Sequence, residues 1–481
     1  MRYLSIIIIV CLAGINGASA QEKWGLRKCV EYAMSNNISI KQIDLQQKIS
    51  AIQLKQSKLS RYPNVSVGNS YSKSFGLREN PTTGIFEDQS FFNVGLNMQT
   101  SATIFNWFSR RNTIAANEYD LLAAKATVDK QKDDISLMVA NAFLQALLAR
   151  EQEKIAGVQL TQSKAQLENT RKLVNAGSLP ELNAAELEAQ VARDSSTLIS
   201  ALGNVTQSLL SLKSIMNLDA AAPFEIEAPP VELIPVDPIA DLQPDYVYAL
   251  ALKNLPQQRI NDLKYKAGEK NVQSAWGSMK PTISAFGGLS TNYVYFKAPI
   301  YQQIPNGTST TPLTVTTNTG TYSVVSPVFT QGGKTGYITP NSFGSQLKSN
   351  FGQNVGISIN VPVFNGGALR SNYERSKINL QNLNLQKESD NQKLKQDIYQ
   401  AYNSAMVALA KFNASKVTVE TSQRTYDFAS KRAAVGMLGT FELITNQNNL
   451  FRAKLEYISN QFDYVFKMKV LEFYKGQGIK L

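Results

Sequence analysis

The 481-residue chain contains no histidine, which removes the commonest general base and the commonest transition-metal ligand. Its 49 Lys and Arg against 37 Asp and Glu give a formal net charge of +12, spread without an arginine-rich patch or an aromatic ladder. Solvated helix faces explain this charge better than nucleic-acid binding does. Composition therefore argues against an enzyme, a cofactor or metal protein and a nucleic-acid-binding protein.

The N-terminus is typical of a secretory signal peptide. Arg2 precedes an apolar run over residues 4–13, and small residues lead to Ala20. We expect cleavage after Ala20 and export of the chain. Cys11 lies inside the apolar run, so no lipid anchor is expected, and Cys29 would be the only cysteine of the mature chain.

The chain predicts an internal duplication, because two intervals recur in its halves. One is 27 residues from an asparagine to a proline, and the other is 72 residues from a phenylalanine to a glycine. The pairs are Asn36 and Pro63, Asn254 and Pro281, Phe105 and Gly177, and Phe364 and Gly436. The offset between the halves grows from 218 to 259 residues, which leaves 41 extra residues in the second half.

The extra residues fall in segment 299–350, which is rich in Thr, Ser, Gly, Asn and Tyr and predicts a long surface loop; its counterpart is the shorter 76–90. A proline-rich acidic segment, 219–245, predicts an extended linker on the outside rather than a core element. The expected divisions are a signal peptide at 1–20, a first repeat at 21–218, the linker at 219–245, a second repeat at 246–475 with an extracellular loop near 297–350, and a tail at 476–481.

Four segments alternate between apolar and polar residues with a period of two, which predicts β-strands with two unlike faces. The apolar positions are Val65, Val67 and Tyr71; Val94, Leu96 and Met98; Ile283, Ala285, Leu289, Tyr293 and Tyr295; and Val355, Ile357, Ile359, Val361 and Val363. A lipid-facing barrel wall has this pattern, and so does a half-buried soluble sheet. Four strands cannot close a barrel alone, so a membrane wall would require an oligomer.

Residues 106–176 predict one very long helix, because they contain no proline and repeat apolar residues every seven positions. The repeating residues are Leu121, Val128, Ile135, Ala142, Ala149 and Ala156. The second half repeats this helix over about 368–435, and segments 26–60 and 181–217 predict shorter helices that could pair with the long one. A purely structural coiled-coil bundle also fits this pattern.

Taken together, the mature chain resembles the TolC-type outer-membrane efflux family. The resemblance rests on the order of four motifs: Trp24 to Asn37 at the start, Tyr62 to Val67 before the first strand, Val361 to Gly367 after the last strand, and Arg432 to Gly436 at a helix end. It implies an internally duplicated α+β membrane protein. Four strands per chain would contribute to a shared trimeric twelve-stranded β-barrel, and long antiparallel coiled-coil helices would form a periplasmic α-barrel.

The resemblance also implies a function. Family members are passive outer-membrane export ducts of tripartite efflux or type I secretion systems, and they dock onto a periplasmic adaptor (membrane fusion protein) that connects to an inner-membrane transporter. The expected location is the outer membrane of a Gram-negative-type cell, in contact with its lipid and extending into the periplasm. The expected partners are two further copies of the chain, the adaptor and the transporter, with no nucleic acid and no cofactor.

Three sets of residues follow from the resemblance. The adaptor-contacting tips would be Arg432, Val435, Gly436 and Leu438 in the second half and Gly177, Ser178 and Leu179 in the first. The periplasmic aperture would involve Glu442, Thr445, Asn446 and Asn183, and the neighbouring Gln447, Asn448 and Asn449 could line it or form a solvated face. The barrel–helix junctions would be Pro63, Phe105, Trp107, Trp276, Pro281, Pro362 and Phe364.

The chain departs from the family pattern at the aperture, where Thr445, Asn183 and Ala433 replace residues that bridge the closed end in the best-known members. An alternative is a trimeric coiled-coil surface protein, an adhesin-like stalk without transport. Such a stalk would place one strand-rich anchor at one end, whereas this chain inserts strands twice between helices.

Overall fold

The computed structural model describes residues 23–79, 86–227, 231 and 234–476, so the expected signal peptide and most of the expected tail lie outside the described residues. The chain divides into two compact units. We call them the helical unit, which takes its residues from 1–54, 115–271 and 375–481, and the strand unit, which takes its residues from 55–114 and 272–374.

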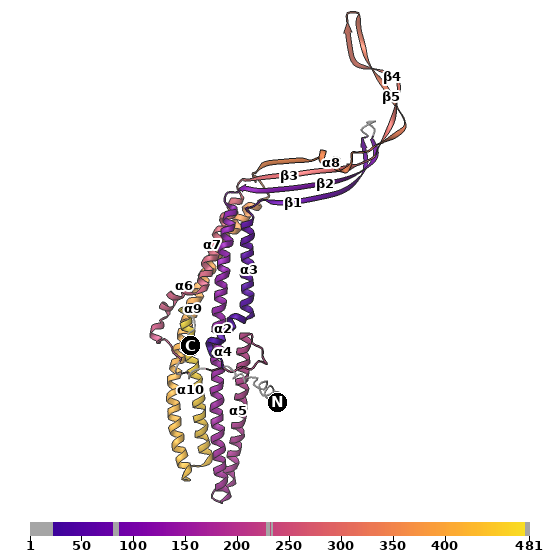
Figure 1. Ribbon diagram of the computed structural model, residues 1–481. Helices are drawn as coiled ribbons and strands as arrows, with labels where there is room; N and C mark the ends of the chain where they lie inside the picture. Colours follow the sequence, from indigo (N-terminus) through magenta and orange to yellow (C-terminus); the bar gives the residue numbers. More distant parts are fainter. Residues whose placement is uncertain (1–22, 80–85, 228–230, 232–233, 477–481) are drawn as a thin grey trace, which may run out of the picture. The chain divides into compact units, whose positions relative to one another are not determined.

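The order of elements confirms the predicted duplication (Figure 1). The first repeat contains α2 (Leu26–Asn36), α3 (Ile38–Leu59), β1 (Asn64–Glu79), β2 (Phe86–Phe105), α4 (Ser109–Asn175) and α5 (Glu181–Met216). After the short 3-10 helix η2 (Ile239–Leu242), the second repeat contains α6 (Pro244–Asn254), α7 (Pro256–Ser278), β3 (Thr282–Tyr295), β6 (Gly352–Asn360), α9 (Ala368–Ala434) and α10 (Thr440–Tyr474). The additional elements β4 (Ala298–Thr317), β5 (Gly320–Ile338) and α8 (Phe343–Ser349) stand between β3 and β6.

The two long helices have equal length: α4 and α9 contain 67 residues each. Their shorter partners match as well, with 36 residues in α5 and 35 in α10. In Figure 1, α4 runs beside α5, and α9 runs beside α10. Ring stacking of Phe412 on α9 with Tyr457 and Tyr464 on α10 holds the second of these pairs together. The predicted long helices and their shorter partners are thus confirmed.

The predicted seven-residue repeat of α4 is buried. Val128, Ile135 and the three alanines that follow at that spacing are all less than 9% exposed, whereas Leu121 is only half-buried. Small side chains at these positions let neighbouring helices approach closely. Ile135 and Ala142 join α2 and the end of α5 in one apolar core, whose fully buried members include Cys29 and Met216.

The predicted linker at 219–245 is not confined to the outside of the molecule. Phe224 and Ile226 pack into the core with α2, Ile234 packs with residues of α10, and Leu242 is fully buried beside α9 and α10. The expectation of an external segment was wrong because it relied on the prolines and acidic residues. The apolar residues scattered between the prolines and acidic residues are the ones that pack against α2, α9 and α10.

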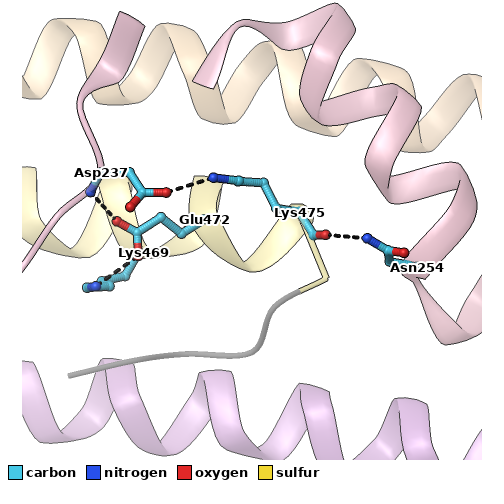
Figure 2. A network of polar contacts seen from close by, with 5 residues as sticks. All are labelled: Asp237, Asn254, Lys469, Glu472 and Lys475. Carbon is cyan, nitrogen blue, oxygen red and sulfur yellow. Dashed lines mark hydrogen bonds and ion pairs between the residues drawn. The ribbon is translucent and has the colours of Figure 1, made fainter. Parts of the chain in front are cut away.

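A polar network fastens the end of α10, and we call it the C-terminal network (Figure 2). Glu472 accepts hydrogen bonds from the backbone N–H of Asp237 at 2.7 Å and from Lys469 Nζ at 2.8 Å. Lys475 pairs with the Asp237 carboxylate at 2.7 Å, and the Asn254 amide donates to the carbonyl of Lys475 at 3.0 Å. The network therefore ties α10 to the linker and to the end of α6.

In the strand unit, four antiparallel strands form one sheet in the order β1-β2-β3-β6. Each hairpin of the duplication supplies two strands, and β2 pairs with β3 across the repeats. The four predicted strands are therefore confirmed, and β1 and β2 also extend through most of segment 76–90, expected as a loop. Within the described chain, β1 and β6 each pair along one edge only.

The predicted loop at 299–350 is mostly regular structure. Strands β4 and β5 form a separate two-stranded sheet, and α8 follows it. The side chain of Gln346 on α8 bonds both the N–H and the C=O of Val294, each at 3.0 Å, which fixes α8 to the end of β3. The loop prediction relied on composition, which was misleading because Thr and Tyr are common in strands as well as in exposed loops.

None of the helices in the described ranges is both long enough and apolar enough to cross a bilayer.

Candidate functional site

The register of the sheet divides its side chains into two faces. Where all four strands pair, Ser66 stands opposite Gln99, Gln99 opposite Gly288, and Gly288 opposite Asn354. Because alternate residues of paired strands share a face, these four define what we call the polar face. In the rows where β3 pairs with β6, its members are Asn64, Ser66, Gly68, Asn97, Gln99, Ser101, Thr103, Thr282, Ser284, Phe286, Gly288, Ser290, Gly352, Asn354, Gly356, Ser358 and Asn360.

The opposite face, which we call the apolar face, carries the predicted apolar positions. Val67, Met98 and Leu289 lie in one cross-strand row, and Ala285 stands opposite Ile357. Much of this face is open in a single chain: Val67 is 78% exposed and Val355 is 90% exposed, whereas Met98 and Leu289 are partly covered and Val94 is buried. A contiguous apolar surface of this kind marks a face that contacts lipid or protein.

The strand–helix junctions bring aromatic residues of both repeats together. Trp107 precedes α4 and Trp276 lies near the end of α7, and both border a cavity of about 270 Å³ that Phe108 also lines. Trp107 and Phe108 have positive φ of 51° and 61°, an uncommon conformation for large residues. Gly277 permits the close approach, because a Cβ there would lie 2.8 Å from the Trp107 carbonyl oxygen.

The remaining predicted junction residues stand where strands and helices change. Pro63 directly precedes β1, Pro281 directly precedes β3, and Phe105 ends β2. Pro362 and Phe364 lie between β6 and α9, and the Phe364 ring is almost fully exposed. The structure therefore gathers Phe105, Trp107 and Phe108 into one aromatic cluster, with ring centroids 5.5 and 5.7 Å apart.

The two predicted tips have the same backbone geometry. At the first, between α4 and α5, Gly177 has φ of 72° and the N–H of Ser178 donates to the carbonyl of Leu173 at 2.8 Å. At the second, between α9 and α10, Gly436 has φ of 73° and the N–H of Met437 donates to the carbonyl of Arg432 at 2.8 Å. This is the glycine C-cap that satisfies the last carbonyls of a helix.

The tips differ in the side chains that they expose. At the second tip Val435 and Met437 are about 70% exposed, and Arg432 reaches back to the Met437 carbonyl at 3.3 Å. Leu438 there and Leu179 at the first tip are half-buried. Phe441, which was not among the predicted tip residues, is 72% exposed and extends the apolar surface of the second tip.

An arginine crosses the first hairpin just above its tip. Arg171 on α4 pairs with Glu181 and Glu188 on α5, and these two carboxylates raise the pKa of Arg171. No motif in the sequence predicted this contact. Arg171 lies six residues before Gly177, and Glu181 lies four residues after it. A search for opposite charges at roughly equal distances on either side of the tip glycine could therefore have predicted this ion pair.

The predicted aperture residues lie on the first turns of the tip-proximal helices. Glu442 and Thr445 on α10 are exposed, and Asn183 on α5 is half-buried. Thr445 and Asn446 bond the carbonyls of Phe441 and Glu442, each at 2.8 Å. Among these four side chains, Glu442 is the one that brings a charge.

Farther from the tips, five polar residues join the two hairpins, and we call them the Asp194 cluster. Asp194 accepts hydrogen bonds from Ser163 at 2.5 Å and from Gln190 at 2.8 Å. Gln447 donates to Ser163 at 3.1 Å, and Asn448 exchanges bonds with Gln190 at 3.1 and 3.3 Å. Ser163, Asp194, Gln190 and Gln447 are all at most 5% exposed.

The Asp194 cluster corrects one expectation about the aperture. Gln447 and Asn448 were candidates for lining the constriction, yet their side chains face the first hairpin within the same chain. Only Asn449 of the three is exposed. Periodicity alone could not separate these roles, because successive residues of a helix point in different directions around it.

The titratable groups with shifted pKa do not form a catalytic arrangement. Burial raises the pKa of Asp120, with Lys264 opposing the shift, and burial together with Asp129 and Asp134 raises the pKa of Asp133. Burial also raises the pKa of Cys29 to about 12. Among the residues that the structure describes, no group of three His, Cys, Asp or Glu could hold a metal ion.

The chain is similar to known outer membrane proteins in both sequence and fold. A family model described as outer membrane efflux protein matches residues 30–218 and 340–468. Outer membrane protein TolC of Escherichia coli strain K12 is 20% identical over 470 residues, which cover 96% of this chain and 84% of TolC.

Several solved structures share the fold, and two of them illustrate the similarity. A crystal structure of CusC superimposes with a TM-score of 0.74 at 17% identity and covers 96% of both chains. The Campylobacter jejuni CmeC outer membrane channel gives a TM-score of 0.70 at 16% identity and covers 95% of this chain and 86% of its own.

Proposed function

The chain belongs to the outer membrane efflux protein family, and we propose that it works as a passive export duct through the outer membrane of a tripartite efflux or type I secretion system. The observation that carries the proposal is the sheet with one polar and one exposed apolar face. Such a sheet is stable in a bilayer when its apolar face meets lipid and its polar face meets a water-filled interior.

The unpaired edges support a trimer. A sheet of four strands with open edges on β1 and β6 is too small to close, since the smallest single-chain barrels use eight strands. Three copies, joined edge to edge, would supply twelve strands and leave no edge unpaired. The duct is then a shared twelve-stranded barrel, extended by the helices of all three copies.

The helical hairpins would carry the duct into the periplasm. At about 1.5 Å per residue, each of the 67-residue helices α4 and α9 spans on the order of 100 Å. The exposed Val435, Met437 and Phe441 and the neighbouring Arg432 give the second tip an apolar surface with a positive charge. We propose that this tip, with Gly177 and Ser178 of the first, contacts a periplasmic adaptor that connects to an inner-membrane transporter.

The gate would lie between the tips and the Asp194 cluster. Glu442 is the acidic residue of the predicted aperture set and is exposed, so three copies would place a ring of three carboxylates near the closed end. Thr445, Asn446 and Asn183 would surround it. No reaction is assigned to the chain, whose role is to provide a path.

Planar bilayers test the proposal. Purified full-length protein should run as a trimer in native mass spectrometry and should pass current, and Glu442→Ala should alter the conductance or its ion selectivity. Asp427→Ala, which removes an exposed carboxylate of α9, is the matched control. Trimers that never pass current, with or without Glu442, would favour the adhesin-like stalk instead.

A further inference from the structure

The polar face is free of ionisable side chains where all four strands pair. In the rows where β3 pairs with β6, its 17 residues are Asn, Gln, Ser, Thr and Gly, with one exception. The exception is Phe286 on β3, which brings an aromatic ring to a face of amides and hydroxyls.

The glycines of this face accommodate side chains from the neighbouring strands. A Cβ on Gly356 would lie 2.6 Å from Cζ of Phe286, and a Cβ on Gly288 would lie 2.5 Å from Oδ1 of Asn354. The ring of Phe286 and the amide of Asn354 therefore lie against backbone rather than standing upright. Phe286 is still 40% exposed, so part of its ring remains open to solvent.

These residues border a shallow cavity of about 700 Å³. Phe286 lines it together with the amides of Asn97, Gln99 and Asn354 and the hydroxyls of Ser66 and Ser290. The cavity thus offers one apolar ring and several hydrogen-bonding groups, with no fixed charge among the residues that line it. Small-molecule sites combine these two elements, apolar contact area and a few polar groups that orient the ligand.

We propose that this cavity is a binding site for uncharged solutes that carry an apolar ring face and a hydrogen-bonding rim. The ring of such a solute stacks on Phe286, and its rim bonds Asn97, Gln99 or Asn354. This inference rests on the proposed duct, because the polar face must line the water-filled interior for cargo to reach it. The expected Kd is on the order of 1 mM, since cargo that binds tightly in a conduit would not leave it.

A simpler role for Phe286 is to cover Gly356 and so stabilise the sheet. Two substitutions separate the roles. Phe286→Leu keeps an apolar side chain over Gly356 and removes the aromatic ring, whereas Phe286→Ala removes both. If only coverage matters, Phe286→Leu should behave as the parent protein does in every binding measurement.

Equilibrium binding to the detergent-solubilised full-length protein tests the site without requiring conduction. The probes are maltohexaose, a neutral saccharide, and chloramphenicol, a neutral aromatic amide, each followed by saturation-transfer NMR. We expect at least one of them to bind and its affinity to fall at least fivefold in Phe286→Leu and Phe286→Ala. Phe92→Ala is the matched control, because Phe92 is 38% exposed on the apolar face.

The outcomes are distinguishable. Binding of maltohexaose alone or of chloramphenicol alone identifies which kind of ring the site takes. Failure of both probes to bind, or equal affinities in Phe286→Leu and Phe92→Ala, overturns the site even if the protein conducts. Binding that depends on Phe286 in a protein that passes no current keeps the site and removes the duct.

Discussion

Ser163 on α4 donates a 2.5 Å hydrogen bond to the carboxylate of Asp194 on α5, and both side chains are buried. Gln190 also donates to this carboxylate, and Gln447 on α10 donates to Ser163. Neutral donors thus hold the carboxylate where α10 meets the first hairpin. A buried carboxylate needs such donors, because an anion without them would destabilise the fold.

Replacing Asp194 should therefore destabilise the protein. Asp194→Ala leaves the Ser163 hydroxyl and the Gln190 amide without their acceptor, at a cost of roughly 2 kcal/mol. We expect a lower thermal midpoint in detergent, measured by circular dichroism. Asp427→Ala removes an exposed carboxylate and should leave the midpoint unchanged. Equal midpoints for the two variants would contradict the importance of the cluster.

The C-terminal network gives a second test of buried charge. Lys469 is only 4% exposed in its side chain, so Glu472→Ala strands a buried ammonium group and should cost about 3 kcal/mol. The double variant Lys469→Met with Glu472→Gln removes both charges and keeps an acceptor for the Asp237 N–H. It should unfold at a higher temperature than Glu472→Ala. The exposed pair of Lys172 and Glu168 is the control, and Glu168→Ala should change the midpoint little.

The tip glycines should tolerate serine unequally. Gly436 has φ of 73°, so Gly436→Ser strains the turn by about 1 kcal/mol, whereas Gly439 has an ordinary φ of −72°. Gly439 is the N-cap residue of α10, a position that serine suits, so Gly439→Ser should not destabilise the protein. Chemical denaturation compares the two variants, and copurification of partner proteins from cells shows whether the reshaped tip loses its contacts. A Gly436→Ser variant as stable as Gly439→Ser would argue against the strain.

Cys29 should be unreactive in the folded protein. Burial raises the pKa of its thiol to about 12, so almost no thiolate exists at pH 8. Maleimide labelling of the mature chain should be slow until it unfolds, whereas Ser178→Cys at the exposed first tip should label within minutes. Because the raised pKa favours the protonated folded state, the stability from this group is complete below pH 9 and declines as pH rises towards 12. Rapid labelling of folded Cys29 at pH 8 would refute this.

The hairpin of β4 and β5 should be dispensable for the main sheet. It pairs only with itself among the described strands, and α8 is attached to β3 through Gln346. Replacing residues 300–336 by a short turn, with α8 retained, should leave trimer formation and conductance intact. Gln346→Ala, which disturbs the attachment of α8 alone, is the comparison. Loss of trimers in the shortened variant but not in Gln346→Ala would show that the hairpin contributes to the sheet.

The sequence by itself determined the repeat, the long helices and the four alternating strands. Matching intervals, such as Asn36 to Pro63 and Phe105 to Gly177, are properties of order along the chain, and so is the two-residue period that separates Val94 from Asn93. Turn glycines are visible in the same way, because a positive φ is readily adopted by glycine alone. The positions of Gly177 and Gly436 at helix ends could therefore be predicted.

Only the tertiary structure decided which side chains meet. Gln447 is buried against the first hairpin while Asn449 is exposed, although both lie in one polar run, because the direction from which a neighbouring helix approaches is not encoded locally. The linker residue Leu242 became core for the same reason. The contact between Phe286 and Gly356 needed the pairing of β3 with β6, two strands separated in the chain by the whole β4–β5 hairpin. Register between distant strands is set by packing and backbone hydrogen bonds, and it alone turned alternation along single strands into two continuous faces.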